Sequence, residues 1–179
     1  GAVRVSLVFA QADLEKHHEV LMRFNIEYLN WAGASVRDHF RLALPDLLGM
    51  SIANYVQGAL EKLCMGNPPD SVFYVVFDGE TATGMGGLRK VGDKVAEIKR
   101  IYVSPASRGG GTGAKILDRL VRDARSFGYR ELLLETGPFM TSAHRIYEAA
   151  GFEDGPPFPG AEVPEELRHD WRFMRRGLS

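Results

Sequence analysis

A glycine-rich segment in the second half of the chain is the clearest candidate for chemistry. Arg108-Gly109-Gly110-Gly111-Thr112-Gly113 follows Pro105 and precedes a stretch with helical spacing. Residues without side chains let successive backbone N–H groups point at one anion, and the positive end of a helix adds to that attraction. The segment therefore predicts a phosphate or pyrophosphate site, in which Arg108 stabilises either the loop or the anion. The alternative is a flexible strand-to-helix turn that binds nothing.

Three glycine-rich nucleotide motifs compete for this segment. The P-loop pattern fails, because Lys115 lacks both the preceding glycine and the following Ser or Thr. Another of the three patterns is Arg/Gln-x-x-Gly-x-Gly/Ala between a strand and a helix. It is matched in full by Arg108, Gly111 and Gly113.

The dinucleotide fingerprint is the other alternative and fits loosely. Gly109, Gly111 and Ala114 have its spacing, and Glu135 lies near the place of a ribose-binding acid. However, residues 104–108 separate these glycines from the preceding strand, and the upstream strands are expected to be joined by hairpins. A dinucleotide site therefore remains a weaker alternative, to be tested by NAD binding.

Two further residues have the types that acid–base chemistry uses. Glu97 lies two residues into a predicted strand of mostly apolar neighbours, where a desolvated carboxylate is suited to accepting a proton. The alternative for Glu97 is an ion pair with Lys99 or with a cation on the next strand. Tyr147 lies inside a predicted helix, where it either packs in the core or offers its hydroxyl to a partner.

Hydrophobic spacing predicts the elements that hold these residues. The predicted strands cover residues 3–9, 72–77, 81–89, 95–103, 132–135 and 170–175. The predicted helices cover 14–31, ended by Gly33, then 45–65, 113–127 and 141–150. Strands 72–103 should form an antiparallel meander, in which Gly84, Gly86 and Gly87 allow a bulge or a close approach, and 95–135 a parallel crossover. The predicted fold class is α/β, with a mixed, mostly antiparallel sheet and helices on both faces.

Three motifs in a fixed order carry a family resemblance. They are Glu97-Ile-Lys-Arg-Ile-Tyr-Val-Ser-Pro, the glycine segment 108–113, and Ala143-x-x-Ile146-Tyr147-Glu148-x-x-Gly151-Phe152. Over about residues 72–152, the chain resembles the GNAT superfamily of acyl-CoA-dependent N-acetyltransferases. The resemblance implies a splayed sheet whose strands 95–103 and 131–135 part to admit the pantetheine arm of coenzyme A.

The resemblance also implies a reaction and a set of site residues. It implies direct transfer of acetyl from acetyl-CoA to a primary amine, with Glu97 as general base, commonly through water, and Tyr147 as general acid toward the coenzyme sulfur. Met140 stands where the family often has an asparagine. The implied cofactor-binding residues are Ile101, Tyr102 and Val103 for pantetheine, Arg108, Gly109, Gly110, Gly111, Thr112, Gly113 and Ala114 for the pyrophosphate, and Ser142 and Ala143 on the later helix.

The acceptor is expected to be a small-molecule or peptide amine. We expect the helices of residues 13–65 and the loop 153–169 to shape its pocket, and homodimers are frequent in the family. Transfer of another acyl group and a non-catalytic acyl-CoA sensor are the alternative functions.

Composition narrows the class of protein. The 179 residues predict one domain, 1–179, and 22 Lys and Arg against 23 Asp and Glu argue against a nucleic-acid partner. A single cysteine, Cys64, argues against a disulfide framework or a thiolate metal cluster, and no metal is expected. No window has 18 uninterrupted apolar residues, so no membrane association is expected. The N-terminus lacks a signal-peptide pattern and Gly1 indicates a processed start, so we expect a cytoplasmic protein.

Overall fold

The computed structural model describes residues 6–179 and contains a seven-stranded sheet in the order β1-β2-β3-β4-β5-β7-β6. Neighbouring strands are antiparallel except β4 and β5, which are parallel as the crossover predicts. The strands are β1 (Leu7–Gln11), β2 (Val72–Asp78), β3 (Thr81–Gly92), β4 (Val95–Val103), β5 (Glu131–Thr136), β6 (Glu153–Asp154) and β7 (Arg172–Gly177). The α-helices are α1 (His18–Phe40), α2 (Leu44–Leu48), α3 (Ile52–Leu63), α4 (Thr112–Ser126) and α5 (Thr141–Ala149). This confirms the predicted fold class.

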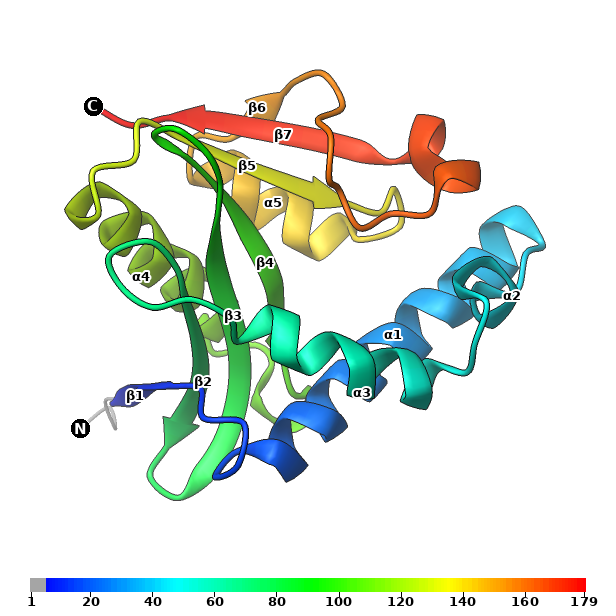
Figure 1. Ribbon diagram of the computed structural model, residues 1–179, viewed down its shortest axis with the longest axis horizontal. Coiled ribbons are helices and arrows are strands. Elements are labelled where there is room, and N and C mark those ends of the chain that lie inside the picture. Colours follow the sequence, from blue (N-terminus) through cyan, green and yellow to red (C-terminus); the bar gives the residue numbers. More distant parts are fainter. Residues whose placement is uncertain (1–5) are drawn as a thin grey trace.

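Helices cover both faces of the sheet, with α1 and α3 on one face and α4 on the other (Figure 1). The two-residue alternation of a strand explains how one strand serves both cores. In β2, Val72, Tyr74 and Val76 pack into the core that contains α4. Phe73 and Val75 point the other way and pack into the core that contains α1 and α3. A β2 buried on both faces is what its uninterrupted apolar run predicts.

The glycines of β3 permit a close approach, as predicted. A Cβ added at Gly84 would lie 2.6 Å from the carbonyl oxygen of Tyr102 on β4. A Cβ added at Gly86 would lie 2.8 Å from the side chain of Ile116 on α4. Small residues at these positions therefore let β4 and α4 lie directly against β3.

The predicted end of the first helix is wrong. Gly33 lies inside α1, which continues to Phe40 and ends at Arg41 in the left-handed conformation (φ 59°). Gly33 packs against the next helix instead, since a Cβ there would lie 3.5 Å from Cβ of Leu44. Tertiary contact thus overrides the helix-breaking tendency of the glycine.

The single helix predicted over 45–65 is two helices. Gly49 adopts φ 75° and ends α2, and the hydroxyl of Ser51 then caps α3 by accepting the N–H of Asn54. At the N-terminus, residues 3–5 of the strand predicted over 3–9 lie outside the described residues, and β1 extends to Gln11.

The sheet opens into a fork between β4 and β5. Only three residue pairs join these strands, and the last is Glu97 with Leu133. Beyond it β4 continues to Val103 with β3 as its partner, whereas β5 continues beside β7. Figure 1 shows β5 and β7 crossing the direction of β3 and β4. The three pairs are called the seam below, and the parted segments after them the fork.

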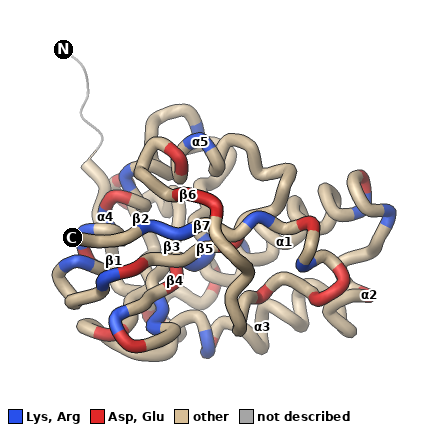
Figure 2. Tube along the Cα trace, turned by 90° about the horizontal axis from the view of Figure 1, so that it is seen from above, with Lys and Arg blue, Asp and Glu red and all other residues tan. Residues whose placement is uncertain are grey.

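Charged residues of both signs are interspersed along the chain trace (Figure 2). Within residues 6–179, no three His, Cys, Asp or Glu side chains gather in a way that could hold a metal ion. None of the helices described has the length and apolar character needed to cross a bilayer.

Candidate active site

The β4 side of the fork carries a β-bulge. Lys99 pairs with Gly87 and Tyr102 with Met85, so two residues of β4, Arg100 and Ile101, oppose a single residue of β3. Arg100 adopts φ 55°, a conformation that costs a non-glycine residue on the order of 1 kcal/mol or more. The bulge turns β4 just beyond the seam.

Backbone groups of β4 face the fork at its far end. The N–H of Ser104 donates to the carbonyl of Thr83 on β3 (2.9 Å). Because successive residues of a strand point their N–H groups to opposite sides, the N–H of Val103 points away from β3, toward the fork. The predicted pantetheine-binding residues Ile101, Tyr102 and Val103 therefore line one edge of the fork, with Ile101 in the bulge.

The glycine segment forms the turn from β4 into α4. Gly109 and Gly111 have positive φ angles of 90° and 78°, and Gly111 caps the helix without a side-chain hydrogen bond. A Cβ added at Gly109, Gly110 or Gly111 would meet no atom within 4 Å, so the loop faces open space. The first N–H groups of α4, including those of Thr112, Gly113 and Ala114, have no partners within the helix. Open space beside unpartnered donors at a helix N-terminus suits a phosphate group.

Arg108 stabilises the loop. Its Nε donates to the carbonyl oxygen of Val103 (3.1 Å), and its guanidinium lies 5.7 Å from the ring centroid of Tyr102. Of the two roles left open by the sequence, this contact favours the first.

Helix α5 brings the third motif to the same place. A Cβ added at Gly113 would lie 3.3 Å from Ile146 of α5 and 3.8 Å from Val103 of β4, so α4, α5 and β4 meet there. Ala143 packs against the core, and Ser142 is exposed at the first turn of α5. Met140, in place of the expected asparagine, is buried and accepts a hydrogen bond from Thr136 through its sulfur (3.5 Å).

Tyr147 is buried on the inner side of α5. Its ring packs near that of Phe152, with centroids 6.1 Å apart. Burial raises the pKa of the Tyr147 hydroxyl, and the nearby Tyr28 of α1 raises it further.

Glu97 is fully buried and paired. Its Oε1 accepts a hydrogen bond from Nη2 of Arg89 (2.9 Å), and its Oε2 lies 4.0 Å from Nζ of Lys99. This is the ion pairing with Lys99 and a cross-strand cation that the sequence offered as the alternative. Glu97 lines neither of the two cavities next to it. The catalytic role predicted for Glu97 remains a prediction.

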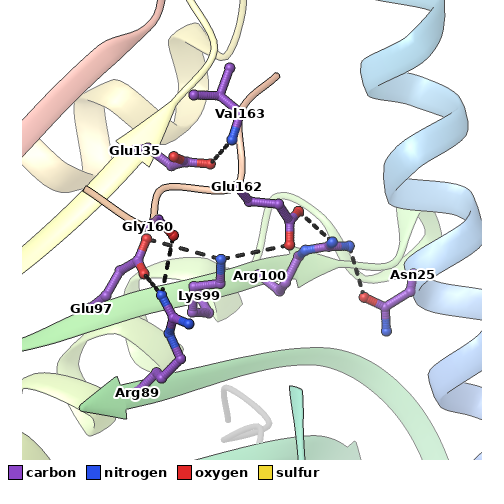
Figure 3. A network of polar contacts seen from close by, with 9 residues as sticks. All are labelled: Asn25, Arg89, Glu97, Lys99, Arg100, Glu135, Gly160, Glu162 and Val163. Carbon is purple, nitrogen blue, oxygen red and sulfur yellow. Dashed lines mark hydrogen bonds and ion pairs between the residues drawn. The ribbon is translucent and has the colours of Figure 1, made fainter. Parts of the chain in front are cut away.

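Lys99 joins this pair to a second one. Nζ of Lys99 lies 3.7 Å from Oε2 of Glu162, whose Oε1 accepts a hydrogen bond from Arg100 (Figure 3). Arg100 also donates to Asn25 of α1 (3.1 Å). The network fastens the loop after β6 across β4 to α1.

Two cavities flank Glu162. The first lies between α1, the β4 bulge and the end of β5, and its wall includes Tyr28, Tyr55, Arg100 and Glu135. The second lies toward α3, and its wall includes Lys62, Arg89 and Gly160.

Glu135 is a site residue that acid–base reasoning from the sequence missed. The sequence indicates only a ribose-binding role for Glu135, whereas the structure places it in the wall of the first cavity. Burial raises the pKa of its carboxyl to about 7. Its position two residues beyond Leu133 on β5 is the signal that could have found it, since alternation places it on the same face as Leu133.

Comparison with known proteins gives a consistent result. A family model described as "Acetyltransferase (GNAT) family" matches residues 35–152. The IAA acetyltransferase of Azospirillum brasilense is 36% identical over 111 residues, which cover 62% of this chain and 70% of that protein. The uncharacterized N-acetyltransferase YsnE of Bacillus subtilis is 26% identical over 133 residues, covering 65% of this chain and 88% of that one.

Solved structures share the fold along nearly the whole chain. An acetyltransferase of the GNAT family from Staphylococcus aureus Mu50 superposes with a TM-score of 0.69 at 18% identity, covering 97% of this chain and 100% of that one. The PaiA N-acetyltransferase of Thermoplasma acidophilum, solved in complex with coenzyme A, superposes with a TM-score of 0.66 at 16% identity, covering 97% and 99%.

Proposed function

Because the chain belongs to the acetyltransferase (GNAT) family and is an acyltransferase, we propose that it transfers acetyl from acetyl-CoA to a primary amine. The acceptor is a small molecule or the amino group of a peptide, bound in the first cavity between α1, the bulge and β5.

The observation that carries this proposal is the fork with the glycine loop at its open end. The fork leaves the N–H of Val103 without a strand partner on that side. At the same end, open space at Gly109–Gly111 lies beside the unpartnered N–H groups of α4. An extended chain with amide groups that ends in a pyrophosphate matches both features, and acetyl-CoA is such a molecule. A protein of the same fold was solved with coenzyme A bound, which supports the proposal.

The chain's own residues then have separate tasks. Residues 101–103 accept and orient the extended arm, and residues 108–114 hold the pyrophosphate. Ser142 and Ala143 bound the arm from α5. The Tyr147 hydroxyl stays protonated at neutral pH and is the group that donates a proton to the departing thiolate. Because burial raises its pKa, it is a weak acid, and its help should be moderate.

An amine panel with detection of free thiol tests the function. The purified protein is mixed with acetyl-CoA and, in turn, polyamines, amino acids, amine-bearing antibiotics and peptides with free N-termini. We expect thiol release and an acetylated product with at least one of these. Tight binding of acetyl-CoA without turnover on the whole panel would favour a non-catalytic sensor. Faster thiol release from a longer acyl-CoA would favour another acyl group.

A further inference from the structure

Two carboxylates lie near the seam on the face of the sheet that α1 covers. Glu97 belongs to the last β4–β5 pair, and Glu135 follows its partner Leu133 by two residues on β5. The orientation of β5 is fixed by its neighbours. Leu133 packs with the core of Val163 and Phe173, whereas the residues on either side of it pack toward α4. Glu135 therefore shares the cavity face with Leu133, just past the point where the strands part.

Glu97 is poorly placed to receive a proton from a bound amine. Its side chain is 0% exposed. Its Oε1 is hydrogen-bonded to Arg89, and its Oε2 lies 4.0 Å from Nζ of Lys99 without a hydrogen bond. Accepting a proton there would neutralise the carboxylate that Arg89 and Lys99 stabilise. The side chain also lines neither cavity, and no part of it is exposed to an amine bound in either one.

Glu135 is placed differently. Its Oε1 accepts the backbone N–H of Val163 (3.1 Å), which holds the carboxyl group in the cavity wall (Figure 3). Its Oε2 is buried and has no hydrogen-bond partner among the described residues. The same is true of Oε2 of Glu97, but of the two only Glu135 lines a cavity in which a ligand could supply that partner. A buried polar atom without a partner is costly, so such atoms in a folded protein call for an explanation. A bound ammonium group would supply the missing partner.

Tyr28 of α1 interacts electrostatically both with Glu135 and with Tyr147, the predicted general acid. Besides burial, Glu135 contributes to the raised pKa of Tyr28, and Tyr28 contributes to the raised pKa of Tyr147. The ring of Tyr28 also packs near that of Tyr102, with centroids 6.3 Å apart, on the β4 edge of the fork. Glu135 lines the cavity on the α1 side of the sheet, and Tyr147 packs in the core on the α4 side.

We propose that the carboxylate of Glu135, rather than that of Glu97, accepts the proton of the acceptor ammonium group in this reaction. This inference rests on the proposed acetyl transfer. The ammonium loses one proton to Glu135, and the freed nitrogen lone pair forms the C–N bond with the thioester carbon. The C–S bond breaks with its electron pair moving to sulfur. Tyr147 gives its proton to the thiolate and regains one from the nitrogen, so the amide keeps one N–H and Glu135 releases its proton to solvent.

The groups that face Glu135 agree with this role. Its pKa of about 7 is raised first by burial and further by Glu97 of β4 and Glu162 of the loop, and it is lowered by Lys99 and by the N–H of Val163. Tyr28 and Tyr55, whose pKa values are raised to about 12, are neutral at pH 7. A base with a pKa near the working pH is efficient, because it is partly ionised and holds an amine proton well.

The test compares three Glu→Gln variants by the pH dependence of kcat/KM, on the best acceptor from the amine panel. Glu135→Gln should lower kcat/KM at pH 7.5 by roughly a hundredfold or more and abolish the acidic limb of the profile near pH 7. Glu97→Gln should keep that limb but move it to lower pH, because the charge of Glu97 helps to raise the pKa of Glu135. Glu131→Gln is the matched control, since Glu131 lies on the same strand and face but pairs with Arg175 (2.7 Å) away from the cavity. Its profile should match that of the parent.

A binding measurement and a conservative substitution separate a lost base from lost structure. Glu135→Gln should keep the affinity for coenzyme A, by calorimetry, within a few-fold of the parent. Glu135→Asp should recover part of the rate together with the acidic limb. An acidic limb that survives in Glu135→Gln but disappears in Glu97→Gln would overturn the inference and leave acetyl transfer intact. A parent protein inactive on the whole panel would overturn the proposed function and this inference with it.

Discussion

The raised pKa of Glu135 makes a prediction about stability that needs no substrate. In the unfolded chain this carboxyl has its ordinary pKa of 4.5, and folding raises it to about 7, chiefly by burial. Between these values the folded state holds the proton more tightly than the unfolded state. The native protein therefore loses stability as the pH rises through this window. A rise of this size corresponds to up to about 3 kcal/mol, since one pKa unit is about 1.4 kcal/mol.

Glu135→Gln removes this dependence, because glutamine does not titrate. The variant should gain about 2 to 3 kcal/mol relative to the parent between pH 5 and pH 8. Urea denaturation gives the free energy of unfolding of both proteins at pH 5 and pH 8. The gain is the variant-minus-parent difference at pH 8 less the same difference at pH 5, so the contributions of other titrating groups cancel. Glu131→Gln, on the same strand but paired with Arg175, should show no such gain. Equal stability differences at pH 5 and pH 8 would refute the reasoning that the Glu135 carboxyl is desolvated.

Four other substitutions have defined outcomes. Gly111→Val forces a β-branched residue into φ 78° at the cap of α4 and should weaken coenzyme A binding more than tenfold, about 1.4 kcal/mol, by calorimetry. Tyr147→Phe should lower kcat roughly ten- to a thousandfold and leave the affinity for coenzyme A within a few-fold of the parent. An unchanged kcat, measured with an acceptor for which the chemical step is rate-limiting, would show that Tyr147 is a packing residue. Glu97→Gln weakens the buried pair with Arg89 and should cost about 1–3 kcal/mol in urea denaturation. Gly84→Ala places a Cβ 2.6 Å from a carbonyl oxygen and should lower the melting temperature, with about 1–3 kcal/mol lost.

Local signals predicted the frame of the molecule well. The meander, the crossover and the α4 start were readable because strand alternation, turn residues and the glycine segment all act over a few residues. Gly33 misled the prediction because its role depends on Leu44, a residue that only folding brings beside it.

The site was predictable only where its residues belong to short motifs along the chain. The glycine loop and the position of Tyr147 follow from motifs along the chain. The pairing of Glu97 with Arg89 depends on the register of β3 and β4, in which Arg89 lies directly opposite Glu97. The cavity at Glu135 depends on where β5 parts from β4 and on a loop nearly thirty residues later, which no short pattern in the chain reveals.

The fork also gives this sheet two edges in its interior. An edge strand exposes a row of unpaired N–H and C=O groups that can recruit a strand of another molecule, and proteins commonly keep such edges short. The outer strands here follow that rule, since β1 has five residues and β6 has two. The interior edges are protected by geometry instead. The seam closes them at one end, and α1 and α5 pack on the two faces of the sheet beside them, which leaves little room for a foreign strand to align there. A narrow, extended molecule that enters from the end at the glycine loop can lie along these edges. The protein thereby keeps backbone hydrogen-bonding groups free for a ligand without exposing them to strands of other molecules.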